Sequence, residues 1–161
     1  VERGVVDYET HLFGGVEAGH LDYLFTLPDD VDLAGAQSLT FLCEVSSKRL
    51  GAPQTHTDGP GWPSDLIVSM NGVPVHSVTL PDQYADSRGA LSHLHGFRGR
   101  YGDLVRVEVS GGALDQVRRQ SGRQVLVRLE TPRSALNHRG LVVYSSRAGR
   151  VPCDVTLIVA R

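Results

Sequence analysis

A chain of 161 residues, 40% hydrophobic and 21% charged, with a formal net charge of −2, has the length and composition of one globular domain. The small net charge excludes a general attraction to nucleic acid or to anionic membranes. No apolar run approaches the roughly 20 residues that a membrane-spanning helix needs.

The chain begins at Val1 and carries no recognisable signal peptide, so we interpret residues 1–161 as a single domain cut from a longer protein. It contains no evident linker, internal repeat or low-complexity tract.

Alternation of apolar and polar residues dominates the sequence and predicts half-buried strands of antiparallel sheets. Leu39, Phe41, Cys43 and Val45, for example, form the apolar face of one such strand. In chain order, we predict strands over residues 21–27, 39–46, 65–70, 73–79, 105–109, 125–130, 141–145 and 155–160. A short helix is expected over residues 113–120 and is stopped by Ser121-Gly122.

Asn71-Gly72 separates two of these strands and is the strongest short signal for a hairpin, because a type I′ turn needs positive φ at both central residues. Eight or so short strands with Gly- and Pro-rich connections predict an all-β fold, a β-sandwich of jelly-roll type with one short helix. The charges on two of the strands could pair across neighbouring strands of a solvated face. They are Arg106 with Glu108, and Arg128 with Glu130.

Cys43 is expected to be a buried thiol, because it lies on the apolar face of its strand. Neither Cys43 nor Cys153 has a partner at zinc-binding spacing, and a disulfide between them stays open. Glu44 is expected to be half-buried with a structural role, with its charge balanced by Lys48 or Arg88.

The segment 80–104 lacks a sustained strand or helix period, although predicted strands lie on both sides of it. Loops longer than about 15 residues are uncommon in compact domains and are usually functional or disordered. The flanking strands argue against disorder, so we expect a ligand site here. Its polar and aromatic residues are Asp82, Tyr84, Asp86, Arg88, His93, His95, Arg98, Arg100 and Tyr101.

A second Gly- and Pro-rich segment, residues 50–64, holds the only tryptophan, Trp62. An exposed Trp can stack on the apolar face of a sugar ring, whereas a buried one would plug the end of the sandwich. The sequence leaves both interpretations open, and the same ambiguity holds for Tyr84 and Tyr101.

Signals for catalysis are weak. Glycosidases use two carboxylates about 5–9.5 Å apart, and Asp82 and Asp86 are close in sequence, but an ion pair between Asp86 and Arg88 that braces the loop is favoured. His93 and His95 lie on one side of an extended segment, yet two imidazoles without further ligands are more simply hydrogen-bond donors. No G-x-S-x-G elbow and no Gly-rich phosphate loop occurs, so a hydrolase triad and nucleotide binding lack support.

The combination of EVSSKR, SMNGVPV, LPDQYADSRGALSH, RYGDLVRV, GLVVY and DVTLIV resembles the sugar-binding β-sandwich module found as an accessory domain on glycoside hydrolases, notably those of family 2. The resemblance covers about residues 39–159. It implies a galactose-binding-like jelly roll and a catalytic domain elsewhere in the parent protein. The chain departs from the family where His93-Leu94-His95 stands in place of a Trp-His pair.

We therefore expect a non-catalytic carbohydrate-binding module that targets an attached glycoside hydrolase to its polysaccharide or oligosaccharide. Loops at one end of the sandwich would offer an aromatic platform together with charged hydrogen-bonding groups. The expected ligand-binding residues are Trp62, Tyr84, Asp86, Arg88, His93, His95, Arg98 and Tyr101, followed by His56 and Asp58.

A structural calcium ion is the one cofactor left open, because sandwich modules of this shape often carry one and Asp58, Asp65, Asp82 and Asp103 offer oxygen ligands. The expected partners are a carbohydrate and the covalently linked catalytic domain, without nucleic acid or membrane, in a monomeric and extracellular module. Two alternatives stay open: a structural domain that packs on a catalytic domain without binding glycan, and a small glycan-degrading enzyme.

Overall fold

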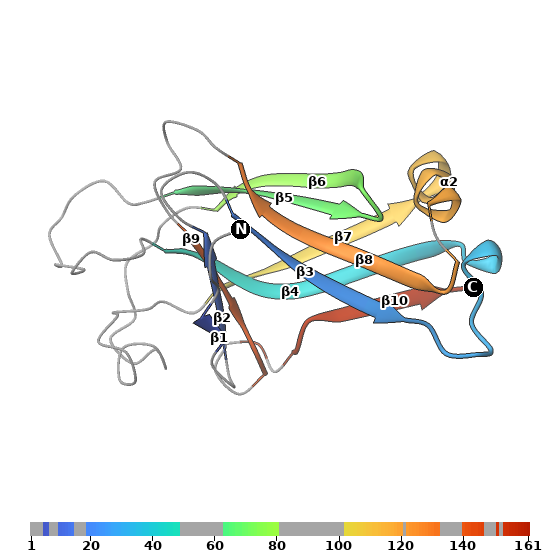
Figure 1. Cartoon of the computed structure of the whole chain (residues 1–161), viewed down its shortest axis with the longest axis horizontal. Coiled ribbons are helices and arrows are strands. Elements are labelled where there is room, and N and C mark those ends of the chain that lie inside the picture. The colour runs from blue at the N-terminus through green and yellow to red at the C-terminus, as the bar shows by residue number, and fades with distance from the viewer. Residues whose placement is uncertain are drawn as a thin grey trace, which may run out of the picture.

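The fold is taken from a computed structural model, which describes residues 5–6, 10–14, 19–48, 63–80, 102–120, 122–132, 140–146, 151 and 153–161. Within these residues the chain forms two antiparallel sheets, one α-helix and one short 3₁₀ helix (Figure 1). This confirms the all-β sandwich with one short helix that the sequence predicts. Neither helix is long and apolar enough to cross a membrane.

The smaller sheet has four strands, in the order β3, β8, β5, β6. Their bounds are Gly19–Thr26 for β3, Gln124–Thr131 for β8, Ser64–Met70 for β5 and Val73–Leu80 for β6.

The larger sheet has six strands in the described part of the chain and is organised around β4, Ser38–Lys48. β7 lies along one edge of β4, while β10 and β9 follow each other along the opposite edge, and β2 and β1 continue from β9. The bounds are Asp103–Ser110 for β7, Thr156–Ala160 for β10, Gly140–Tyr144 for β9, Thr10–Gly14 for β2 and Val5–Val6 for β1.

The core lies between the two sheets, because each strand turns its apolar face inward. Phe25 of β3 and Phe41 of β4 meet across this core with ring centroids 6.4 Å apart, in the edge-to-face arrangement that aromatic pairs favour. Other buried members come from both sheets: Leu39, Cys43, Val45, Val107, Val109, Leu66, Val68, Met70, Val125, Val127 and Leu129. Burial of these side chains is the main force that holds the sandwich together.

Helix α2, Gly111–Arg119, follows β7 directly and covers one end of the sandwich (Figure 1). Leu114 and Val117 are its buried residues. The Arg118 guanidinium ties α2 to the 3₁₀ helix η1, Leu33–Gly35, by donating from Nε to the carbonyl oxygen of Leu33 at 2.9 Å.

All eight predicted strands and the helix are present, with ends that differ from the predictions by a few residues. β1, β2 and η1 were not predicted. β1 and η1 have two and three residues, which are too few to show a period. β2 has the sequence THLFG, in which the apolar residues Leu12 and Phe13 are adjacent and do not alternate with polar ones.

The predicted hairpin turn is confirmed, because Asn71 and Gly72 have φ values of 49° and 79°. The Asn71 side chain also connects this turn to β8 and to α2. Its Oδ1 accepts a hydrogen bond from the amide of Leu126 at 2.8 Å, and its Nδ2 donates to the carbonyl oxygen of Val117 at 3.2 Å.

The predicted cross-strand pairing of the two Arg/Glu sets is wrong, because β7 and β8 belong to different sheets. Arg106 instead contacts Glu108, two residues along on the exposed face of the same strand, at 2.8 Å. Arg128 pairs with Asp22 of the neighbouring strand β3, also at 2.8 Å. The register of the sheets, which the sequence does not give, decides these partners.

The prediction of a buried thiol at Cys43 is confirmed, since the residue is completely buried. Cys43 and Cys153 are both free, so this structure contains no disulfide between them.

Candidate functional site

The ten predicted ligand-binding residues all lie outside the described residues, in the segments 51–62 and 81–101. They are Trp62, Tyr84, Asp86, Arg88, His93, His95, Arg98, Tyr101, His56 and Asp58. What the structure does describe is the frame to which both segments are attached.

That frame is formed by strand ends that meet at one end of the sandwich. Segment 49–62 follows β4 and precedes β5, and segment 81–101 follows β6 and precedes β7. Ser64 pairs with Leu80 in the smaller sheet, and Val45 pairs with Asp103 in the larger one.

The two sheets are joined at this end by a buried hydrogen bond. The Ser47 hydroxyl, on β4, donates to the Ser64 hydroxyl, on β5, at 3.0 Å, and both residues are almost completely buried. We call this end of the molecule the Ser47–Ser64 end. It lies opposite α2, because β4 runs from Ser38, which pairs with Ser110 just before the helix, to Lys48.

A buried carboxylate reinforces the Ser47–Ser64 end. Glu44 is completely buried, rather than half-buried as the sequence suggested. Its Oε1 accepts from the amide of Gly102 at 2.8 Å and its Oε2 from the amide of Val151 at 2.7 Å. Arg88, one of the two cations expected near it, lies outside the described residues. The expected structural role of Glu44 is thus visible as a clamp on two backbone amides.

Gly102 approaches β4 so closely that no side chain fits there. A Cβ atom at this position would lie 2.7 Å from the backbone nitrogen of Val45 and 2.8 Å from Cγ of Glu44. Its lack of a side chain therefore lets the amide of Gly102 reach the Glu44 carboxylate.

Tyr144 and Ser46 add a second polar contact near the Glu44 clamp. Tyr144 lies opposite Glu44 on β9, and its hydroxyl is 3.0 Å from the Ser46 hydroxyl. Burial raises the pKa of Tyr144 to about 12, so the phenol is neutral over the physiological range.

Two of the four aspartates considered for calcium are described. Asp65 accepts a hydrogen bond from the Thr79 hydroxyl at 2.6 Å, and Asp103 begins β7 in the other sheet. Asp58 and Asp82 lie outside the described residues. Within the described part, no group of three or more His, Cys, Asp or Glu side chains could hold a metal ion.

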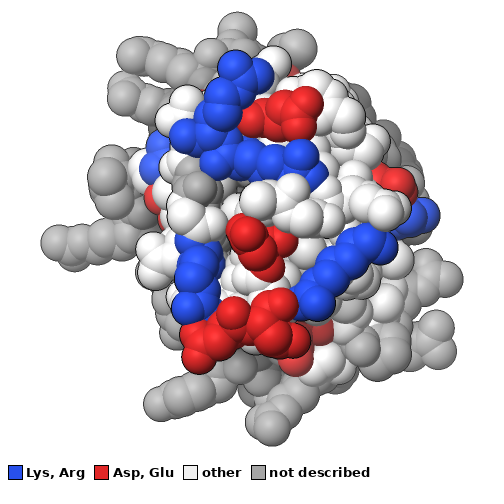
Figure 2. All heavy atoms as spheres, turned by 90° about the vertical axis from the view of Figure 1, so that its right-hand side faces the viewer, with Lys and Arg blue, Asp and Glu red and all other residues white. Residues whose placement is uncertain are grey.

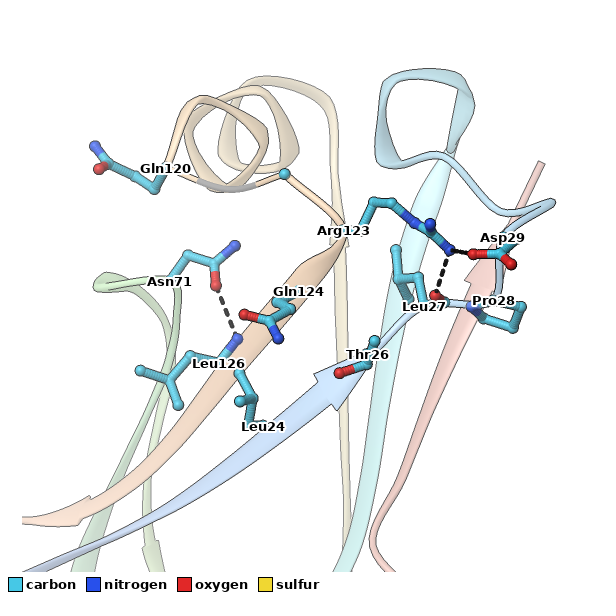
Figure 3. A pocket seen from close by; sticks show the side chains of 11 residues that line it. Leu24, Thr26, Leu27, Pro28, Asp29, Asn71, Gln120, Arg123, Gln124 and Leu126 are labelled. Atoms are coloured by element: carbon cyan, nitrogen blue, oxygen red, sulfur yellow. Dashed lines mark hydrogen bonds and ion pairs between the residues drawn. The ribbon is translucent and has the colours of Figure 1, made fainter.

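A separate open groove of about 1020 Å³ lies at the α2 end (Figure 3). Its walls come from β3, β8, the turn at Asn71 and the segment after α2. The residues that line it are Leu24, Thr26, Leu27, Pro28, Asp29, Asn71, Gln120, Gly122, Arg123, Gln124 and Leu126.

The most exposed large hydrophobic side chain in the described part lies in this groove. Leu24 is 60% exposed and pairs across the sheet with Leu126 on the outer face. Both leucines interrupt rows of polar residues on that face, such as Asp22 and Thr26 on β3. This interruption is the sequence signal that could have revealed the groove.

The charges around the groove are largely paired with one another. Arg123 forms an ion pair with Asp29 and also donates to the carbonyl oxygen of Leu27 at 3.1 Å. Figure 2 shows basic and acidic side chains interspersed over the α2 end. Such mixing gives no single-sign field for nucleic acid or another polyanion.

The sequence matches no protein-family model, and no curated protein is significantly similar to it.

Proposed function

We propose that the chain is a non-catalytic carbohydrate-binding module, with a galactose-binding-like jelly-roll topology, that holds a covalently linked glycoside hydrolase at its polysaccharide or oligosaccharide. The observation that supports this most is the meeting of four strand ends at the Ser47–Ser64 end. Both segments that contain the candidate ligand residues are attached there, so the topology brings their ends to one side of a rigid scaffold.

The residue types in these segments suit a sugar. Trp62, Tyr84 and Tyr101 offer flat apolar surfaces for a pyranose ring, at little cost in side-chain entropy. Arginine and histidine side chains donate hydrogen bonds to hydroxyls, and Asp86 accepts from them. A bound glycan would therefore meet both apolar contact and directional hydrogen bonds, the combination that sets specificity in ligand sites.

The frame to which both segments are attached is held by hydrogen bonds between its strands. The Ser47–Ser64 hydrogen bond and the bond from Gly102 to Glu44 are buried, and buried hydrogen bonds are lost only when the surrounding packing opens. A site built on fixed strand ends loses less conformational entropy on binding than one built on free chain. A polysaccharide ligand implies an extracellular location. A calcium ion, if bound, would stabilise the fold and would take no part in a reaction.

Affinity gel electrophoresis of the chain against a panel of plant and microbial polysaccharides tests the proposal. We expect one class of glycan to retard the chain, and Trp62→Ala to abolish the retardation. Leu24→Ala is the matched control, because it removes a large exposed apolar side chain at the opposite end. Equal retardation of Trp62→Ala and the unaltered chain would remove Trp62 from the site. No retardation of a folded chain by any glycan would overturn the proposed function.

The groove at the α2 end favours a second candidate, a structural domain that packs against a linked catalytic domain without binding glycan. Its apolar floor of Leu24 and Leu126 is the kind of exposed patch that marks a protein contact. The glycan screen separates the two candidates, because only the first predicts that Trp62→Ala changes the behaviour of the isolated chain.

A further inference from the structure

Among the residues that the structure describes, strand β10 is an edge strand without the charges or prolines by which proteins protect such edges. In the described part of the chain, β10 pairs only with β4, along residues 38–42 (Figure 1). A strand with one neighbour leaves half of its backbone N–H and C=O groups pointing outward, ready to pair with another chain.

The other long edge strands carry protective residues. β3 has Asp22, β6 has Pro74, and β7 has Arg106 and Glu108. Charges and prolines at these positions oppose pairing with a further strand. β10 has the sequence TLIVA, without a charge or a proline. Apart from the two-residue strand β1, its edge is therefore the one most open to pairing among the described edge strands.

The side chains of β10 are arranged for contact on both faces. Val155, Leu157 and Val159 pack against the core, whereas Ile158 turns outward and is 48% exposed. It is one of three exposed large hydrophobic residues in the described part. Ile158 is also the central residue of Thr156–Ala160, so it would lie in the middle of any contact made by the whole strand.

Opposite charges flank the strand. Asp154 precedes β10 and Arg161 follows it, and both residues are exposed. Within the chain, Asp154 accepts a hydrogen bond from the amide of Ser146 at 2.8 Å, and Arg161 forms an exposed ion pair with Asp30 at 3.6 Å. Antiparallel pairing of two identical strands brings the start of one beside the end of the other. The Asp154 carboxylate of one copy would therefore lie near the Arg161 guanidinium of its partner at both ends of the contact. A guanidinium has five N–H donors, so Arg161 can hold Asp30 of its own chain and a second carboxylate together, which favours a second copy of this chain over an unrelated strand.

We propose that β10 pairs antiparallel with β10 of a second copy, so that the larger sheets of two chains form one continuous sheet. Residues directly opposite in an antiparallel pair must point to the same face. With all five residues paired, this requirement places Ile158 opposite Ile158 at the two-fold axis, and Leu157 opposite Val159. The interface is isologous, as in most homodimers.

This proposal replaces the monomer expected from the sequence, because the exposed edge becomes visible only once the order of strands is known. It does not depend on glycan binding, and its test uses no glycan.

Cysteine cross-linking tests the register. Directly opposite Cα atoms are about 4.5–5.5 Å apart, within the range of a disulfide. In a Cys153→Ser background, Ile158→Cys should therefore form a covalent dimer on oxidation with copper phenanthroline. Thr156→Cys is the matched control, because it faces outward on the same strand but its counterpart would be about 13 Å or more away. Cross-linking of both variants to the same extent, or of neither, would overturn the proposed register.

Sedimentation equilibrium tests the dimer itself. We expect the unaltered chain to dimerise and Ile158→Lys to weaken the dimer at least about tenfold, since two lysines would face each other at the two-fold axis. Leu104→Lys is the control, because Leu104 lies on the edge strand β7 of the same sheet and is equally exposed, at 49%. Circular dichroism shows whether both variants fold. An unaltered chain that stays monomeric at all concentrations would overturn the proposal, as would a dimer that both variants leave intact.

Discussion

The Oε1 atom of Glu44 lies 2.8 Å from the backbone nitrogen of Gly102, so a buried carboxylate on β4 holds the residue that leads into β7. The second oxygen of the same carboxylate holds Val151, which lies 107 positions away from Glu44 in the sequence. One side chain thus fixes two distant parts of the chain to the central strand of the larger sheet.

Replacement of Glu44 by alanine should destabilise the fold strongly, because one buried amide and one part-buried amide lose their acceptor. Each unsatisfied amide costs about 1–3 kcal/mol, so we expect a loss of about 2–6 kcal/mol in the free energy of unfolding by urea. Glu108→Ala removes an exposed glutamate from β7 and should cost less than about 1 kcal/mol. Similar losses for the two variants would contradict the role of the clamp.

Gly102→Ala should destabilise the fold by about 1–3 kcal/mol or more, because the added Cβ would collide with backbone atoms of Val45, which cannot move aside as a side chain can. Gly112→Ala in α2 is the matched control, since a Cβ there meets nothing within 4 Å. That change should stabilise the chain by up to about 1 kcal/mol by reducing the entropy of the unfolded state. Urea midpoints of the two variants should therefore move in opposite directions.

The sequence predicts the elements of this fold better than their partners. Each long strand shows its own alternation of apolar and polar residues, and the turn at Asn71-Gly72 follows from the positive φ that these two residue types tolerate. Local residues therefore suffice to predict both. The partner of Arg128 depends on which strands become neighbours, and that depends on the whole topology. For the same reason, Gly102 stands out in the sequence only as part of a motif, whereas its close approach to Glu44 is a tertiary fact.

For the candidate site, too, the sequence predicts the residue types, whereas their attachment to the fold follows only from the structure. The residue types in segments 51–62 and 81–101 suggest a ligand, and the fold adds that both segments attach to the Ser47–Ser64 end. The groove at the α2 end was missed because single leucines on a polar face, such as Leu24, are common and carry little weight without the sheet order. The edge of β10 was missed because exposure of an edge depends on which strands pair.

Asn71 offers a test that separates backbone strain from hydrogen bonding. Asn71→Ala should cost about 2–4 kcal/mol, because alanine disfavours positive φ and cannot replace the bonds to Leu126 and Val117. Asn71→Gly keeps the turn but loses the same two bonds, so its loss should be smaller by about 1 kcal/mol or more. Equal unfolding free energies for both variants would show that the turn geometry contributes nothing.

The Asp22–Arg128 ion pair predicts a pH dependence. Its hydrogen bond from Arg128 lowers the pKa of Asp22 below the ordinary value of 3.8. A lowered folded-state pKa means that the pair stabilises the chain above pH 3.8 and that this stabilisation is lost as the pH falls through the folded-state value. Both side chains are about one third exposed, so the contribution is at most about 1 kcal/mol.

Urea unfolding of the unaltered chain and of Asp22→Asn, followed from pH 7 to pH 2, measures this contribution. The difference between the two free energies should be constant down to about pH 4 and then shrink toward zero. A difference that stays constant to pH 2, or that grows as the pH falls, would contradict the assigned partner.

Cys43 should be inert in the folded chain. The thiol is completely buried, and burial raises its pKa to about 12, so the reactive thiolate is scarce at neutral pH. Cys153 is partly exposed and free. Iodoacetamide at pH 8 should therefore modify Cys153 alone in the native chain and both cysteines in urea, which mass spectrometry of the digested protein can resolve. Rapid modification of Cys43 under native conditions would show that the sandwich opens along β4, and protection of both thiols even in urea would reveal a disulfide that this structure does not contain.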